Sequence, residues 1–180
     1  MKKLTLLRHA KSDWNDPVSR DFDRPLNRRG MKAARRMGEW MRSQRLDFDT
    51  VLASPALRVV ETLDHLAAGL GRPMAPIFNE RIYLASAVTL IDVLRESDGL
   101  GDHVLLVGHN PGLEDLVFEL AGDTVDSPIA DDVATKFPTG AVVEMEFPCE
   151  SWSDLDGSKG HLIRFTRPRD LDPALGPDGT

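Results

Sequence analysis

The sequence predicts a three-layer α/β/α fold, a mostly parallel sheet with helices on both faces. Two continuous apolar runs, 4–7 and 103–107, are typical of strands that are buried on both sides. Stretches with helical spacing of apolar residues lie between the expected strands, and this alternation is what a parallel sheet requires. At 180 residues, with 41% hydrophobic and 28% charged residues, the chain suits one globular domain with a sizeable core.

The expected elements alternate in order along the chain. After the strand at 4–7, residues 13–27 are rich in Asp, Arg and Pro and read as a loop. Apolar periodicity predicts helices over 30–46, 55–70, 87–96 and 113–121. Short apolar runs predict strands over 50–53, 74–78 and 103–107. Ser54-Pro55 marks a helix start, with serine as the N-cap and proline in the first turn.

The last third of the chain is less regular. Residues 122–138 are polar and predict an irregular loop, and the apolar runs at 141–147 and 162–166 predict two strands that could pair. We expect a single domain over 1–167, because no repeat or linker interrupts it. The tail 168–180 holds three prolines and two glycines and is expected to be disordered.

Net charge and cysteine content limit the possible partners and the cellular compartment of the protein. A net charge of −7 argues against a general nucleic-acid or membrane-surface role, which needs a net basic face. The one cysteine, Cys149, leaves no disulfide framework and favours a reducing compartment. The run 4–7 is too short for a signal-peptide core, and no stretch approaches the roughly 20 apolar residues of a membrane span. We therefore expect a cytoplasmic protein.

Polar residues follow three of the predicted strands at the point where each ends. Arg8 and His9 follow the first strand, Ser54 and Arg58 the second, and His109 the run at 103–107. Because the carboxyl ends of parallel strands meet at one edge of a sheet, these side chains should converge there. Taken alone, Arg8 and His9 could also mark a strand that merely reaches the surface.

Converging arginines, histidines and a helix N-terminus make an anion site. Guanidinium groups match phosphate oxygens, and a helix N-terminus adds unpaired N–H groups. Neutral imidazole can accept a phosphoryl group, and cationic neighbours should keep the pKa of His9 low enough to leave it uncharged near neutral pH. The same cations would stabilise the transferring phosphoryl oxygens, and a carboxylic acid would still be needed to protonate the leaving group.

Four segments, in order, resemble the signature of the histidine phosphatase superfamily, also called phosphoglycerate mutase-like. They read LRHAKSDWN at 7–15, SPALR at 54–58 followed by Glu61-Thr62, NERIY at 79–83 and VGHN at 107–110. The resemblance implies a phosphoglycerate mutase-like fold and a phosphoric monoester or phosphohistidine hydrolase that uses no metal and no cofactor.

The resemblance also implies roles for the matching positions. His9 would be the nucleophile that becomes phosphohistidine, and Glu80 the general acid that later activates water. The other positions would bind the phosphoryl group: Arg8, Arg58, His109, Ser12 and Asn15.

Details of the first motif resemble one branch of the superfamily. Most members have glycine where this chain has Ala10, and RHAKS at 8–12 with DRPL at 23–26 is similar to the small SixA-like phosphohistidine phosphatases. Only 29 positions separate Glu80 from His109, which leaves no room for a large lid. An open site suits phosphohistidine in a protein. It also suits small phosphorylated molecules.

Two alternatives therefore stay open beside a phosphohistidine phosphatase acting on a protein. The first is a broad-specificity phosphomonoesterase of the same family, because Glu80 would help with ester substrates and the best-known type of the branch lacks an evident acid. The second is a non-catalytic module that binds phosphorylated ligands, although the presence of His9 and Arg58 argues against it. The expected partner is a phosphorylated protein or small molecule, with no nucleic acid and no membrane.

Other polar residues are expected to lie outside the chemistry. Lys11 is interpreted as a charge on the rim and His65 as a surface histidine, while Thr139-Gly140 could bring a backbone amide to the pocket. Cys149 lacks the arginine that a cysteine-dependent phosphatase loop carries six positions later. The Asp-x-Asp at 47–49 follows a predicted helix end rather than the apolar strand that a magnesium-dependent phosphatase requires.

Overall fold

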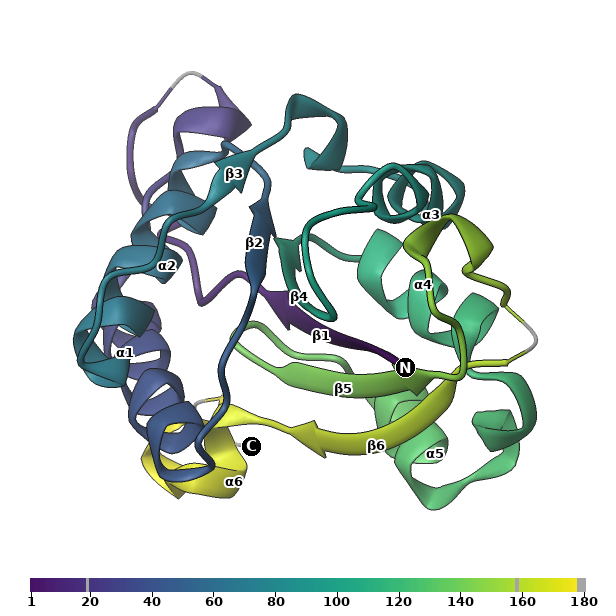
Figure 1. Ribbon diagram of the computed structural model, residues 1–180. Coiled ribbons are helices and arrows are strands. Elements are labelled where there is room, and N and C mark those ends of the chain that lie inside the picture. Colours follow the sequence, from purple (N-terminus) through teal and green to yellow (C-terminus); the bar gives the residue numbers. More distant parts are fainter. Residues whose placement is uncertain (19, 158, 178–180) are drawn as a thin grey trace.

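The computed structural model describes residues 1–18, 20–157 and 159–177, which form one six-stranded sheet in the order β3-β2-β4-β1-β5-β6 (Figure 1). The strands are β1 (Lys2–Arg8), β2 (Thr50–Ala53), β3 (Ile77–Phe78), β4 (His103–Gly108), β5 (Val142–Phe147) and β6 (His161–Thr166). The first four are parallel to one another, whereas β5 runs antiparallel to β1 and β6 runs antiparallel to β5. The predicted mostly parallel sheet is confirmed.

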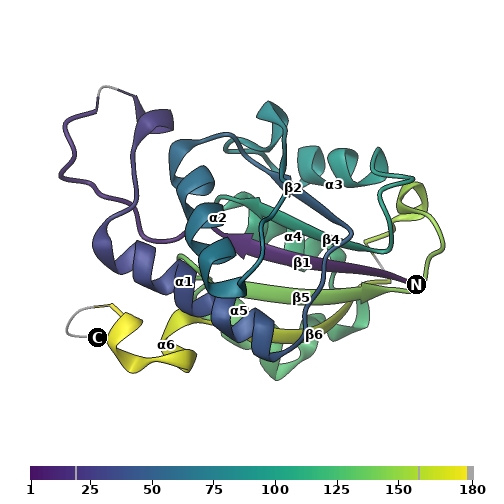
Figure 2. The same ribbon diagram turned by 60° about the vertical axis from the view of Figure 1, so that its left-hand side comes forward.

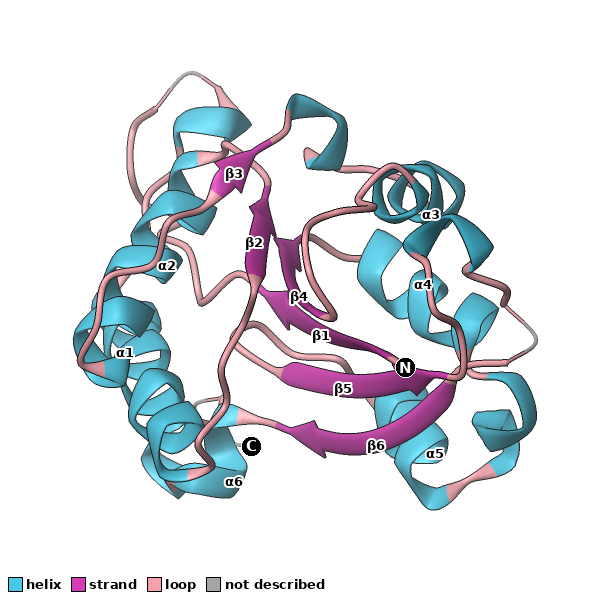
Figure 3. Ribbon diagram, viewed as in Figure 1, coloured by secondary structure: helices cyan, strands magenta, loops and turns pink. Residues whose placement is uncertain are grey.

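Helices cover both faces of the sheet (Figure 3). The longer ones are α1 (Arg28–Ser43), α2 (Leu57–Leu70), α3 (Ala87–Arg95), α4 (Gly112–Leu120) and α5 (Pro128–Thr135). The first two pack on one face and the other three on the opposite face, so the protein has two apolar cores separated by the sheet. Within the described part of the chain, no helix is long and apolar enough to cross a membrane.

Strand β1 is buried because both cores use it. Leu4 and Leu6 point into the core under α3, α4 and α5, while Leu7 points into the core under α1 and α2. All three side chains are at most 1% exposed. Burial on both faces explains why the run reads as continuously apolar rather than alternating.

Two predicted elements differ in extent from the structure for reasons that local contacts show. The helix predicted over 30–46 starts earlier, since the Asn27 side chain accepts a hydrogen bond from the Gly30 amide and caps α1 at Arg28. The strand predicted over 74–78 shrinks to Ile77–Phe78 at the edge of the sheet. Proline has no N–H for a sheet ladder, and Pro73 and Pro76 precede this strand.

The predicted loop at 122–138 was wrong over its second half, which forms α5. Ser127 accepts a hydrogen bond from the Ala130 amide and Pro128 occupies the first turn, so this serine-proline pair is a helix start. The pair Ser54-Pro55 does not start a helix, because α2 begins only at Leu57 and has no side-chain cap. Ser54 contacts a histidine of the site described below instead.

The expected disordered tail at 168–180 contains ordered helical turns in its described part. The short helix α6 (Pro168–Leu171) lies against α1 (Figure 2). Buried Pro168 and a hydrogen bond of 3.1 Å from Arg29 Nη1 to the Gly176 carbonyl hold this segment. This part of the tail is ordered because it packs on α1, and amino-acid composition does not reveal such contacts. The expectation for 178–180 lies outside the described residues.

The register of β1 and β4 positions the site. These parallel strands pair Arg8 with Gly108, and the His9 amide then donates to the Gly108 carbonyl at 3.1 Å. His9 and His109 therefore emerge from adjacent strand ends, with ring centroids 5.3 Å apart. The start of α2 reaches the same edge because β2 lies on the other side of β4.

Helices α1 and α2 approach so closely that glycines are needed at their contact. A Cβ atom added to Gly69 would lie 1.9 Å from the Arg35 carbonyl oxygen, and one added to Gly38 would lie 2.1 Å from that of Leu66. Both distances are far below van der Waals contact, and the obstructing atoms are backbone. The α1–α2 layer, which holds Arg58 in place, therefore depends on these two glycines.

Gly69→Ala should destabilise the protein by about 1–3 kcal/mol, because the added methyl group forces the helices apart. Helix propensity alone predicts the opposite sign, a gain of about 1 kcal/mol. Urea unfolding followed by circular dichroism measures the difference. Exposed Ala68→Gly is the control for propensity. A stabilised Gly69→Ala protein would contradict the close approach.

Candidate active site

His9 is buried, with 6% of its surface exposed, and one ring nitrogen is fixed by the backbone. Its Nδ1 lies 2.7 Å from the Ala10 carbonyl oxygen. A carbonyl only accepts hydrogen bonds, so Nδ1 carries the proton and Nε2 of the neutral ring carries the lone pair. The ring is therefore held in the tautomer that presents Nε2 for reaction.

The Ala10 segment is itself anchored to α2. The Ala10 amide donates to Thr62 Oγ1 at 3.0 Å, and the Thr62 hydroxyl donates to the Arg58 carbonyl at 2.6 Å. Thr62 belongs to the second motif of the sequence. Its hydroxyl links the loop that orients His9 to the helix turn that carries Arg58.

Arg58 spans the two histidines from the first turn of α2, with a side chain only 2% exposed. Its Nε lies 3.4 Å from His9 Nε2, and its Nη2 lies 3.3 Å from His109 Nδ1. A guanidinium only donates, so both histidine nitrogens act as acceptors here. The arginine thus marks the place where an anion on His9 Nε2 would be held.

His109 adopts the opposite tautomer from His9. Because Nδ1 accepts from Arg58, Nε2 carries the proton and donates to Ser54 Oγ at 2.7 Å. This contact explains why Ser54 does not cap α2. Ser54 is fully buried and supports the histidine instead.

Asp21 is a site carboxylate that the sequence analysis did not single out. Its Oδ2 accepts from Arg58 Nη2 at 2.9 Å and from the Tyr83 hydroxyl at 2.6 Å, and its Oδ1 lies 2.9 Å from Arg24 Nη2. Burial alone would raise the pKa of Asp21, but the hydrogen bond from Tyr83 and the charges of Arg58 and Arg24 lower it overall. Asp21 is therefore ionised and orients Arg58.

Burial and charge keep both site histidines neutral. Burial is the largest cause and lowers the pKa of His9 well below 6.5; the hydrogen bond to Ala10 opposes it, and nearby His109, Arg58 and Arg8 act with it. Burial, followed by the charge of Arg58, lowers the pKa of His109 to about 4. At neutral pH His9 Nε2 is thus unprotonated.

A pocket of about 300 Å³ joins these residues. Its lining includes the predicted residues Arg8, His9, Ser12, Arg58 and His109, together with Lys11, Trp14, Asp21, Arg24, Leu84, Asn110 and Thr139. The structure therefore brings five of the seven predicted site residues together. The Gly140 amide donates to the Arg8 and His9 carbonyls, so it is used by the backbone rather than by a ligand.

The other two predicted residues lie outside this lining. Asn15 is exposed, and its described contact is a hydrogen bond from its amide to Asp13 Oδ1 at 2.9 Å. Glu80 is exposed at the start of the short 3-10 helix η2 (Glu80–Ile82). Three residues further on, Tyr83 turns toward the site, so the NERIY segment supplies a hydroxyl to Asp21. The acid role of Glu80 stays a prediction.

Among residues 1–18, 20–157 and 159–177, no group of three or more His, Cys, Asp or Glu side chains could hold a metal ion.

Comparison with known proteins shows the family of the chain. A model of the histidine phosphatase superfamily (branch 1) matches residues 4–82. The uncharacterized protein Rv1276c of Mycobacterium tuberculosis (strain H37Rv) is 35% identical over 167 residues, which span 91% of this chain and all of that protein. The phosphohistidine phosphatase SixA of Escherichia coli (strain K12) is 28% identical over 126 residues, 68% of this chain and 76% of SixA.

A solved structure of the protein histidine phosphatase SixA complexed with tungstate has the same fold. It matches with a TM-score of 0.76 at 23% identity, over 94% of this chain and 99% of that one. The chain belongs to the histidine phosphatase superfamily. Within the superfamily it is SixA-like, as the first motif indicated.

The lowered histidine pKa values predict that the folded protein becomes less stable as the pH falls below 6.5. In the unfolded chain histidine binds a proton near pH 6.5, whereas folded His109 does so only near pH 4. The stabilisation from neutral His109 is complete above pH 6.5 and is lost as the pH falls, at a cost of about 3 kcal/mol by pH 4.

Ring C–H resonances followed by NMR against pH measure this directly. We expect His109 to be half-protonated near pH 4 in the folded protein, with His9 also well below 6.5. The same resonances in urea provide the unfolded control. A His109 midpoint near 6.5 in the folded protein would show that the ring is not buried among cations.

Proposed function

We propose that the protein is a metal-independent phosphatase that acts through a phosphohistidine intermediate on His9 and removes phosphate from phosphohistidine in a protein. Membership of the superfamily implies phosphatase activity. The observation that carries the proposal is the Nδ1 hydrogen bond of His9 to Ala10, because it leaves Nε2 unprotonated opposite Arg58. We also propose a reducing, cytoplasmic location, because the sequence has a single cysteine and so no disulfide framework.

Phosphoryl transfer to His9 would proceed by attack of the Nε2 lone pair on phosphorus. The bond between phosphorus and the substrate nitrogen breaks as the new bond forms, and the His9 ring gains positive charge that the Ala10 carbonyl stabilises. Water then attacks phosphorus, the bond to Nε2 breaks, and inorganic phosphate leaves with both protons of the water. His9 returns to its neutral state.

Arginines supply the charge that a metal supplies elsewhere. The Arg58 Nε–H that points at His9 Nε2 is placed to donate to an oxygen of a phosphoryl group on that nitrogen. Arg8 lines the same pocket, with Nη1 held by the Phe137 carbonyl at 3.0 Å. We also assign phosphate binding to His109, because a bound dianion favours its protonated form, and to Ser12.

The acid–base balance of the pocket favours phosphohistidine over esters. Among the described lining residues Asp21 is the one carboxylate, and its lowered pKa keeps it ionised. An alkoxide leaving group needs a proton from the enzyme. The imidazole of phosphohistidine does not, because its second ring nitrogen can take a proton from solvent and it then leaves as a neutral ring.

His9→Ala should abolish labelling of the protein by a reactive phosphate donor. Wild-type protein is expected to form an acid-labile, base-stable phosphoenzyme in the presence of excess chelator, because the nucleophile is His9 and the cations are side chains. His65→Ala, which changes a histidine outside the pocket, is the matched control and should label normally. Labelling that persists in His9→Ala protein contradicts the mechanism.

The phosphomonoesterase alternative makes a different prediction for Glu80. The acid role predicted for Glu80 requires Glu80→Gln to slow turnover of an alkyl phosphate far more than turnover of a phosphohistidine peptide. A phosphohistidine phosphatase that does not use this exposed side chain, which lies outside the pocket lining, requires changes of less than about threefold on both substrates. Steady-state rates on the two substrates provide the measurement. A loss of about 100-fold or more confined to the alkyl phosphate would identify Glu80 as the leaving-group acid and favour ester hydrolysis.

A further inference from the structure

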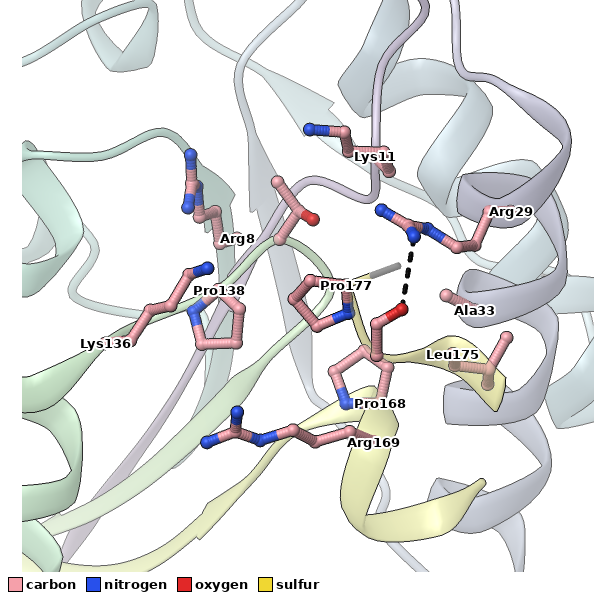
Figure 4. A pocket seen from close by; sticks show the side chains of 12 residues that line it. Arg8, Lys11, Arg29, Ala33, Lys136, Pro138, Pro168, Arg169, Leu175 and Pro177 are labelled. Atoms are coloured by element: carbon pink, nitrogen blue, oxygen red, sulfur yellow. Dashed lines mark hydrogen bonds between the residues drawn. The ribbon is translucent and has the colours of Figure 1, made fainter. Parts of the chain in front are cut away.

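A second pocket, of about 260 Å³, is lined by basic side chains from separate parts of the chain. Figure 4 shows Arg8, Lys11, Arg29, Lys136 and Arg169 around it. The apolar part of its lining includes Ala33, Pro138, Pro168, Leu175 and Pro177. Among the described residues that line it, none is an aspartate or glutamate. In a chain of net charge −7, this is a marked local excess of positive charge.

The acid next to Arg169 in α6 makes its hydrogen bonds outside this pocket. Asp170 follows Arg169 in α6, but both of its oxygens accept from Arg167, at 3.0 Å each. Arg167 is not among the residues that line the pocket. The positive charge of Lys136 and Arg169, both of which are exposed, is therefore available to an anion from solution.

The basic pocket and the catalytic pocket are neighbours. Arg8, Lys11 and Thr139 line both of them. Arg8 is the last residue of β1 and directly precedes His9, so a ligand held by His9 and Arg58 in one pocket would lie next to residues that also line the other. One molecule of modest size can therefore occupy both.

We propose that the basic pocket binds a second anionic group, phosphate or carboxylate, of the same substrate whose phosphoryl group is transferred to His9. The proposal rests on the proposed function and narrows it to substrates with two anions. Guanidinium and ammonium groups stabilise such an anion, and the apolar part of the lining accommodates the carbon atoms that connect the two groups. The neutral part of the substrate then contributes little to selection.

The test compares substrates that differ only in a second anion. One arm uses a phosphohistidine peptide with alanine, glutamate or phosphoserine two residues after the phosphohistidine. The other arm uses phenyl phosphate and 1,4-phenylene bisphosphate. We expect wild-type kcat/KM to be about tenfold higher with the second anion in at least one arm, mainly through KM. The arm that responds identifies the source, a protein or a small molecule.

In the variant Lys136→Gln/Arg169→Gln, the kcat/KM values with and without the second anion should differ by no more than about twofold. Turnover of the substrates that lack a second anion, the alanine peptide and phenyl phosphate, should be unchanged. Lys3→Gln/Lys159→Gln is the matched control, because it removes two positive charges from exposed positions outside the pocket. The control should keep the preference. Wild-type protein without a preference in either arm, or an equal loss in the control, overturns the proposal while the proposed function stands.

If no substrate turns over, that result counts against the proposed phosphatase function alone. A binding measurement then tests the second-anion pocket separately. His9→Ala protein is titrated with inorganic phosphate in a calorimeter. Two sites per chain are expected, and one site after Lys136→Gln/Arg169→Gln is added. A single site in His9→Ala protein, or two sites that survive the charge removal, would overturn the second-anion pocket.

Discussion

The hydrogen bond from His9 Nδ1 to the Ala10 carbonyl decides which nitrogen of a buried ring can react. It exists because the Ala10 segment is tied through Thr62 to the same helix turn that carries Arg58. One short network therefore orients both His9, the proposed nucleophile, and the cation opposite it. The pairing of β1 with β4 adds His109 to this arrangement.

The electrostatics follow from this burial. Two histidines that are at most 6% exposed beside arginines stay neutral, because a further positive charge there would be neither solvated nor paired. Asp21 compensates part of the arginine charge and is itself held ionised. Under the proposed function, the arginines would bind the phosphoryl group and His9 would be the nucleophile. Among the described lining residues Asp21 is the one carboxylate and it is ionised, a combination that fits a leaving group able to take its proton from solvent.

The mostly parallel sheet and the convergence of Arg8, His9 and His109 were predictable, because apolar runs mark buried strands and these residues lie at their ends. Asp21 was not, since it reaches Arg58 from a loop without periodicity. Serine-proline pairs show the limit of local signals. Ser127 caps a helix as the pattern predicts, whereas Ser54 is used by a histidine from another strand. Tertiary contacts decided between these outcomes.

The central claim is that the backbone presents Nε2 of His9 as the reacting atom. The most direct measurement is NMR of the trapped phosphoenzyme, with phosphorus-31 and nitrogen-15 signals assigning the phosphorylated ring nitrogen. The account predicts phosphorus on Nε2 of His9, with Nδ1 still protonated and bonded to Ala10. Phosphorus on Nδ1, or on a residue other than His9, would contradict it.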